Sequence, residues 1–129
     1  MAVWVNDAAM DAELAWLADC DTYTVCSAQP TTYTEAITTY KLADVTLTAG
    51  DGNGDFTIAN GDTSGRKLTT AQQASIPIDA DGTATHIAWC KSGDTTLRRV
   101  TTCTSQALTN GGTVTVPVQD HEIADATAA

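Results

Sequence analysis

Residues 84–91 read Ala-Thr-His-Ile-Ala-Trp-Cys-Lys, residues 95–103 read Thr-Thr-Leu-Arg-Arg-Val-Thr-Thr-Cys, and residues 92–94, Ser-Gly-Asp, separate them. Two β-prone runs joined by a short turn that contains glycine are typical of a β-hairpin. Ile87 and Trp89 share one parity along the first run, so they predict the hairpin face that turns toward the core. This hairpin is the strongest indication of an antiparallel β fold.

Threonine is abundant, with 24 of the 129 residues. Because threonine is β-branched, it favours strands that are polar outside and packed inside. The long segment 28–40 has no clean period, and we expect an excursion from the sheet with a turn of helix at 35–39. Pro77 and Pro117 indicate edge strands. Further short strands are predicted at 22–27, 45–48, 56–59, 66–70, 75–78 and 113–118.

A single helix is predicted at the front of the chain, over about residues 6–19. Asn6 is its candidate N-cap. Apolar residues follow at a spacing of four and then three, namely Met10, Leu14 and Leu17. Trp16 is expected to widen this buried stripe. One helix and seven or eight short strands predict a mainly β protein, an antiparallel β-sandwich or small barrel with one N-terminal α-helix. We expect a single β-rich domain over 1–129 with an acidic C-terminal tail at 120–129.

The charge of the chain restricts its partners. The formal net charge is −10 and the isoelectric point is near 4.1, so the surface repels phosphate backbones and anionic lipid heads. No apolar run approaches the roughly 20 residues of a spanning helix. We therefore expect neither nucleic acid nor membrane as a partner. The first seven residues show neither a basic region nor an apolar stretch typical of an export signal, which predicts synthesis in a reducing cytosol.

The sequence gives little support for catalysis. Its only imidazoles are His86 and His121, and neither lies in a recognisable catalytic motif. The glycines link predicted strands, whereas a phosphate-binding loop needs them between a strand and a helix. We predict no enzyme activity and no cofactor.

Four cysteines, Cys20, Cys26, Cys90 and Cys103, are the candidates for disulfide bonds within or between chains. Their spacing matches no common zinc ribbon. Cys20 and Cys26 are close enough in sequence to form a small loop. Four buried free thiols in a cytosolic protein are the equally weighted alternative.

Hairpin register separates two of these cysteines. If Gly93 and Asp94 form a two-residue turn, Cys90 lies opposite Leu97 and Cys103 lies opposite Ala84. The two thiols then share a face at a separation of about 20 Å, from roughly 3.3 Å per residue, and cannot bond each other. Oxidation would therefore involve other cysteines or other chains.

A calcium site is a further candidate, formed by Asp51, Asn53, Asp55 and Asp62. Oxygen-bearing side chains at alternate positions, with an acid at the twelfth, are typical of a calcium-binding loop. However, the sixth position holds Phe56 where such a loop needs glycine, and no helices flank the segment. The alternative is a glycine-rich hairpin turn whose Asx side chains bond their own backbone.

Four segments resemble small virion proteins of tailed bacteriophages. They are 26–36 (Cys-Ser-Ala-Gln-Pro-Thr-Thr-Tyr-Thr-Glu-Ala), 82–89 (Gly-Thr-Ala-Thr-His-Ile-Ala-Trp), 107–117 (Ala-Leu-Thr-Asn-Gly-Gly-Thr-Val-Thr-Val-Pro) and 122–125 (Glu-Ile-Ala-Asp). The resemblance implies a non-enzymatic capsid decoration, or cement, protein. Its implied partners are the major capsid protein, copies of itself as a homo-oligomer on the particle, and other virion proteins. It also implies a place in the virion, and exposed cysteines there would link subunits after lysis.

Two other classes of function remain open. The first is another virion position, in the neck, tail or baseplate. The second is a receptor- or carbohydrate-binding module, for which Tyr23, Tyr33, Tyr40 and Trp89 would form an aromatic platform.

Overall fold

The structure, a computed structural model, describes residues 6–62 and 64–123. Its elements are α1 (Asp7–Ala18), β1 (Thr22–Cys26), η1 (Glu35–Thr39), β2 (Lys41–Thr46), β3 (Phe56–Asn60), β4 (Arg66–Thr70), β5 (Gln73–Pro77), β6 (Gly82–Lys91), β7 (Thr96–Leu108), β8 (Thr113–Val116) and β9 (Gln119–Ile123). The mainly β class with one N-terminal α-helix is confirmed.

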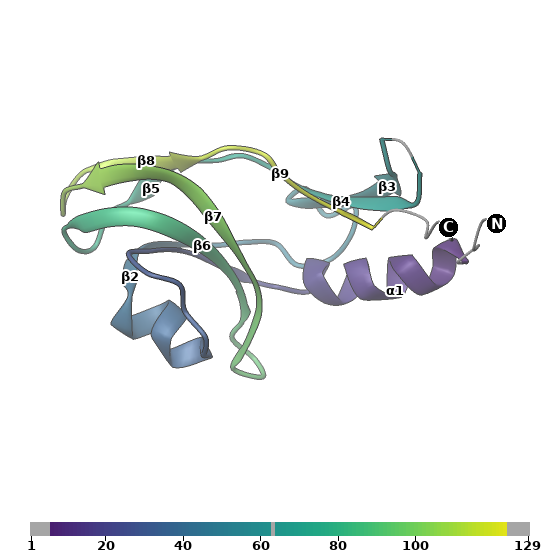
Figure 1. Ribbon diagram of the computed structural model, residues 1–129, viewed down its shortest axis with the longest axis horizontal. Coiled ribbons are helices and arrows are strands. Elements are labelled where there is room, and N and C mark those ends of the chain that lie inside the picture. Colours follow the sequence, from purple (N-terminus) through teal and green to yellow (C-terminus); the bar gives the residue numbers. More distant parts are fainter. Residues whose placement is uncertain (1–5, 63, 124–129) are drawn as a thin grey trace, which may run out of the picture.

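The strands form three antiparallel sheets, with the orders β2-β1-β6-β7, β3-β4-β9 and β5-β8. In Figure 1 the β5-β8 pair lies over one face of the four-stranded sheet, and the blue helix η1 lies below that sheet. Helix α1 runs beneath the β3-β4-β9 sheet at the other end of the molecule. The four-stranded sheet and the β5-β8 pair make an open sandwich, and the described strands do not close into a barrel.

Strand β5 lies beside β2 and joins the two layers. Ala43 and Ile78 form an isolated antiparallel bridge, and the amide of Asp79 donates to the carbonyl of Leu42 at 2.7 Å. The strands therefore wrap part of the way around one core, in the spatial order β8, β5, β2, β1, β6 and β7. Strands β7 and β8 are the two ends of this arc.

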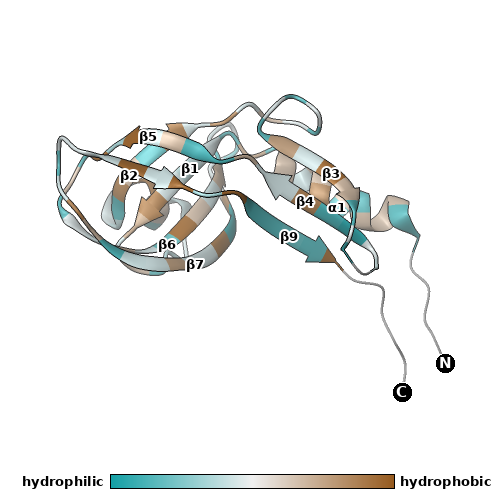
Figure 2. Ribbon diagram, turned by 90° about the horizontal axis from the view of Figure 1, so that it is seen from above, coloured by the Kyte–Doolittle hydropathy of each residue, from teal (hydrophilic) through white to brown (hydrophobic). Residues whose placement is uncertain are grey.

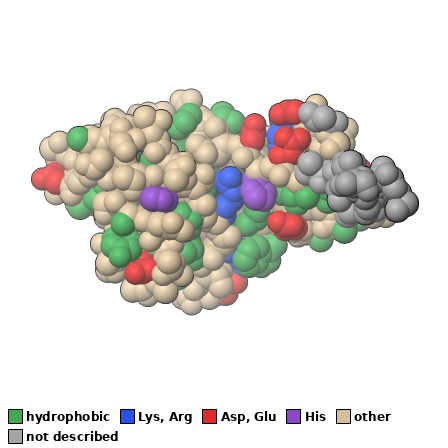
Figure 3. All heavy atoms as spheres, viewed as in Figure 1, with side chains coloured by type: hydrophobic (Ala, Val, Ile, Leu, Met, Phe, Trp, Pro, Cys, Tyr) green, Lys and Arg blue, Asp and Glu red, His purple; other side chains and the backbone are tan. Residues whose placement is uncertain are grey.

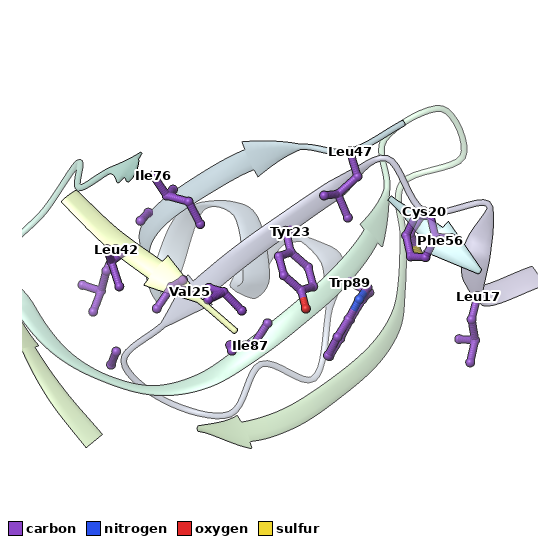
Figure 4. Close-up of a cluster of buried hydrophobic side chains, with 14 of the residues drawn as sticks. Leu17, Cys20, Tyr23, Val25, Leu42, Leu47, Phe56, Ile76, Ile87 and Trp89 are labelled. Atoms are coloured by element: carbon purple, nitrogen blue, oxygen red, sulfur yellow. The ribbon is translucent and has the colours of Figure 1, made fainter. Parts of the chain in front are cut away.

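The core lies on the inner face of the four-stranded sheet (Figure 4). Tyr23 and Trp89 are its largest fully buried side chains, and their ring centroids lie 4.9 Å apart in an edge-to-face arrangement. Ile87 and Trp89 are each only 2% exposed, so the predicted inward face of the hairpin is confirmed. Edge-to-face contact adds to the stabilisation that burial of the two rings provides.

Helix α1 follows the sequence prediction closely. The side chain of Asn6 accepts a hydrogen bond from the amide of Ala8 at 2.8 Å and caps the helix. The apolar stripe faces inward, since Met10, Leu14 and Leu17 are all buried.

The prediction for Trp16 is wrong, because this side chain is 50% exposed. The guanidinium of Arg98 lies 4.4 Å from the centroid of its ring, and Arg98 also donates to the backbone carbonyl of Trp16 at 2.7 Å. A cation over the ring face and the solvent on its other side replace the core contact that we expected.

The excursion predicted over 28–40 and its turn of helix are present, the latter as the single-turn π-helix η1. The carboxylate of Glu35 accepts hydrogen bonds from the amide and the hydroxyl of Thr31 at 2.8 and 2.7 Å, which folds the segment back on itself. Its inner side packs on the outer face of the four-stranded sheet, in a second buried cluster of Cys26, Ala36, Ala88 and Cys90.

The segment predicted as an acidic tail begins instead as strand β9. Asp120 lies opposite Thr69 of β4 and accepts a hydrogen bond from its hydroxyl at 3.0 Å. Strand β9 is hydrophilic, as its teal colour in Figure 2 shows. It forms a strand nevertheless, because it pairs with β4. Residues 124–129 lie outside the described part. The preceding strand ends at Val116, before Pro117, which has no amide to donate. Among the described residues, no helix is long and apolar enough to cross a membrane.

Candidate functional site

A groove of about 560 Å³ lies between β7 and β8. The two strands follow each other in sequence, yet β7 pairs with β6 and β8 pairs with β5. No pairing between β7 and β8 occurs in the described part of the chain. We call this groove the seam. Its floor includes Val25 and Ile87, and its walls come from residues 102–104, Gln106 and residues 114–117.

A bulge in β7 accompanies the seam. Ala84 pairs with Gln106, and His86 pairs with Thr102, so residues 103–105 together oppose the single residue between Ala84 and His86. Extra residues on one strand bend it away from regular pairing. The predicted pairing of Cys103 with Ala84 is therefore wrong.

The seam is bounded at both ends. At one end, residues 109–112 connect β7 to β8, and the amide of Gly112 donates to the carbonyl of Thr109 at 3.0 Å. At the other end, Nε of Arg99 donates to Nδ1 of His121 at 3.1 Å, which joins β7 to β9. The seam is thus a splayed hairpin that is held together only near its ends.

Arg99 differs from the other basic residues. Those residues, Lys41, Arg66, Lys67, Lys91 and Arg98, each have a carboxylate oxygen within 4.0 Å. Arg99 has no such partner among the described residues, although acidic residues outnumber basic ones by 16 to 6. Its guanidinium carbon lies 4.2 Å from the centroid of Trp89 instead. This leaves the two terminal nitrogens of a half-buried cation without an anionic partner in the described part of the protein.

His121 completes this end of the seam. Burial, and then the charge of Arg99, lower the pKa of His121 below its ordinary value, although Glu13 acts in the opposite direction. The ring is therefore neutral at pH 7, and its Nδ1 accepts a hydrogen bond from the Nε–H group of Arg99. Its Nε2 lies 3.9 Å from the carboxylate of Glu13, on helix α1.

Tyr23 contributes a buried donor close by. Its hydroxyl has no hydrogen-bond partner within residues 6–62 and 64–123, and the side chain is only 1% exposed. Figure 4 shows the hydroxyl between Ile87, which lines the seam, and Trp89, which carries Arg99 on its ring. Burial raises the pKa of Tyr23, so the hydroxyl keeps its proton at neutral pH.

The walls of the seam carry no charge. Residues 100–119, twenty in succession, include no acidic or basic side chain, in a chain of which 17% of the residues are charged. On the face in Figure 3, most of the acidic side chains lie at the end of the molecule that holds α1, β3, β4 and β9. Edge strands commonly carry charges or prolines that block pairing with other chains, and β7 has neither from residue 100 onward.

All four cysteines are free, and three of them are buried. Burial raises the pKa of Cys20 and of Cys90 to about 12, so neither thiol forms a reactive thiolate near neutral pH. Cys90 lies opposite Leu97, as the hairpin register predicted. Cys103 is partly exposed and lines the seam. It is thus the cysteine best placed for a bond between chains.

The structure does not bring the four predicted calcium ligands together. Asp51 accepts from the amide of Ile58, Asn53 donates to the carbonyl of Ala49, Asp55 accepts from the amide of Thr48, and Asp62 pairs with Lys67. The described residues contain no group of three or more His, Cys, Asp or Glu side chains that could hold a metal ion. The glycine-rich turn itself is present, with φ values of +81° and +113° at Gly52 and Gly54.

The remaining candidates do not form a common site. His86 is half-buried on the outer face of the sheet, where its Nδ1 lies 2.8 Å from the hydroxyl of Thr85. The predicted aromatic platform is not assembled, because Tyr23 and Trp89 are buried in the core while Tyr33 and Tyr40 are partly buried on the opposite side of the sheet.

Comparisons with family models, with curated proteins and with solved structures gave no match. The site is therefore defined by its geometry alone. Sequence reasoning missed Arg99, although one signal marks it: Arg99 and Asp120 enclose the uncharged run 100–119.

Proposed function

We propose that the protein is a non-enzymatic structural protein of a bacteriophage virion, which decorates the capsid and stabilises it by binding the lattice of the major capsid protein. The observation that carries this proposal is the seam, since two uncharged strand edges flank one groove. A strand edge of this kind recognises a neighbouring chain through its backbone. The resemblance of four segments to small virion proteins supports the same role.

The charge distribution fits attachment to a shell. With a net charge of −10, the protein favours basic patches on its partner, and copies of the protein repel one another in solution. A repeating lattice would hold many copies at fixed positions despite this repulsion, because each copy gains its contacts from the shell. Such an arrangement needs a binding surface and no catalytic centre.

Disulfide bonds between subunits are part of the proposal, and they involve Cys103. After lysis, two Cys103 thiols from neighbouring chains would lose two electrons and two protons to molecular oxygen and form one disulfide. Non-reducing electrophoresis of intact particles tests this step, and a Cys103→Ser variant is the control. A monomer band alone in wild-type particles would contradict it.

Quantitative mass spectrometry of purified phage particles tests the proposed function. A decoration protein should be present in a fixed ratio to the major capsid protein, with copies on the order of hundreds per particle. Only a handful of copies would instead assign the protein to the neck, tail or baseplate. Complete absence from particles that carry the gene would refute a virion role.

A further inference from the structure

We propose that the seam is an acceptor site for one extended peptide segment of a partner, which adds as a strand along the edge of β7 and places a carboxylate on Arg99. This inference rests on the proposed function only for the biological identity of the partner. The site and its ligand chemistry follow from the residues of the seam.

The shape of the seam favours an extended chain. Its wall over residues 102–106 is at most about 16 Å long, from roughly 3.3 Å per residue, and is shorter where the bulge at 103–105 bends the strand, which suits a segment of about four to five residues. β7 and β8 are each the outermost strand of their sheets, so each presents a row of backbone groups toward the groove. An added strand would connect the two ends of the arc of strands and thereby close it.

The floor of the seam favours a peptide segment, here called the guest, in which apolar and polar side chains alternate. Val25, Ile87, Val114 and Val116 form an apolar surface inside the groove. Thr102, Thr104 and Gln106 instead give the rim on β7 a polar, uncharged surface. Successive side chains of a strand point to opposite faces, so every second residue of the guest would pack on the valines and the others would meet the rim or solvent.

Arg99 specifies the charge at one end of the guest. Arg99, Thr101 and Cys103 are every second residue of β7, so they point to the same face of the strand. Cys103 lines the seam on that face. On β9, His121 follows the seam residue Gln119 by two positions. The Arg99–His121 contact therefore lies beyond the lined part of the groove, by about 7 Å counted as two residues of β9 and about 10 Å counted as three residues of β7.

A carboxylate fits this end better than a phosphate. The terminal nitrogens of a guanidinium form a planar fork that matches the two oxygens of a carboxylate. The one cation of Arg99 balances a single negative charge, and the ring of His121 beside it is neutral. A dianionic phosphate would add a second negative charge in a protein that already carries a net −10. The partner segment is therefore an extended, apolar-alternating peptide with Asp or Glu at one end.

Cys103 provides a direct measurement of occupancy, because it lines the seam and is the only one of the four cysteines that is not buried. The probes are acetylated and amidated hexapeptides, Thr-Val-Thr-Val-Thr-Asp and Asp-Thr-Val-Thr-Val-Thr, in which Asp shares the face of the valines; together they test both directions along the seam. Their twins carry Asn in place of Asp. The rate of Cys103 alkylation by iodoacetamide, followed by mass spectrometry at increasing peptide concentration, gives the affinity of each peptide.

One Asp peptide should slow alkylation several-fold at saturation and bind about tenfold more tightly than its Asn twin, as expected for a bidentate charged pair. Arg99→Gln should remove this difference between the twins, and Arg99→Lys should restore only part of it. Arg98→Gln is the matched control, since Arg98 loses the same charge on the neighbouring residue while its partners are Asp19 and Asp94. It should leave the tenfold difference intact. Circular dichroism of each variant verifies the fold.

Three results would overturn the proposal: no protection by any peptide, equal protection by the Asp and Asn twins, or a preference for Asp that survives Arg99→Gln. Protection of Cys103 that rises with protein concentration in the absence of peptide would assign the seam to a second copy of this chain. Peptide binding by a protein that is absent from particles would refute the virion role and leave this inference intact. A particle-bound protein that ignores the peptides would refute this inference alone.

Discussion

The buried hydroxyl of Tyr23 leads to a prediction opposite to the usual effect of a core substitution. A buried polar group without a hydrogen-bond partner destabilises the folded state by about 1–3 kcal/mol. Tyr23→Phe removes that hydroxyl and keeps the ring, including its edge-to-face contact with Trp89 at 4.9 Å. We therefore expect the free energy of unfolding to rise by about 1 kcal/mol, at the lower end of that range because the removal leaves a small void.

Urea unfolding followed by tryptophan fluorescence measures this change. The midpoint should rise while the slope with denaturant stays constant, and the melting temperature should increase by about 4 °C for a chain of this size. Tyr40→Phe is the matched control, because Tyr40 is only partly buried and loss of its hydroxyl should change stability by less than about 0.5 kcal/mol. A loss of 1 kcal/mol or more in Tyr23→Phe would refute the reasoning, since it would mean that the hydroxyl is bonded in the folded protein.

Four further predictions follow from the described contacts. Burial and the neighbouring Arg99 lower the pKa of His121, so as the pH falls His121 is protonated in the unfolded chain before it is protonated in the folded protein. The free energy of unfolding should therefore decline from about pH 6.5 downward. His121→Asn should flatten that part of the plot of urea midpoint against pH. Iodoacetamide at pH 8 should modify Cys103 alone in the native protein and all four thiols in urea, and rapid native labelling of a buried thiol would contradict this. Asn6→Ala should lower the free energy of unfolding by about 1 kcal/mol through loss of the helix cap, whereas an unchanged value would show that the cap adds nothing. Calorimetric titration should show no heat with calcium, because the side chains of the loop 51–62 already bond to other partners; a metal-dependent rise in melting temperature would restore the calcium prediction.

Local signals predicted most of the fold. Asn6 and the stripe behind it defined α1, and the parity of Ile87 and Trp89 defined the inner face of the sheet. These features depend on neighbours in sequence, so short-range rules suffice for them. The strand β4 was predicted with its observed bounds for the same reason, since the turn cluster at 60–62 precedes it.

The misses depend on contacts between residues far apart in sequence. Trp16 is exposed because Arg98, 82 residues later, covers its ring. Strand β9 exists because Asp120 finds a partner on β4, 51 residues earlier. The bulge in β7 moved Cys103 away from Ala84, and no local residue pattern marked it. The seam depends on the last two of these long-range effects, the position of β9 and the bulge in β7, which is why local sequence patterns did not reveal it.

The acidic charge of the protein protects the open strand edges of the seam from pairing between copies. Exposed strand edges without charges tend to pair between copies, which leads to aggregation. Here all sixteen acidic residues lie outside the uncharged run 100–119, so copies of the protein repel one another while the seam itself offers no charge barrier. Repulsion at a distance thus takes the role that a lysine or proline on the edge would otherwise have. Because Arg99 is the one described cation that lacks a carboxylate partner among residues 6–62 and 64–123, the same seam remains selective for an incoming segment that carries one.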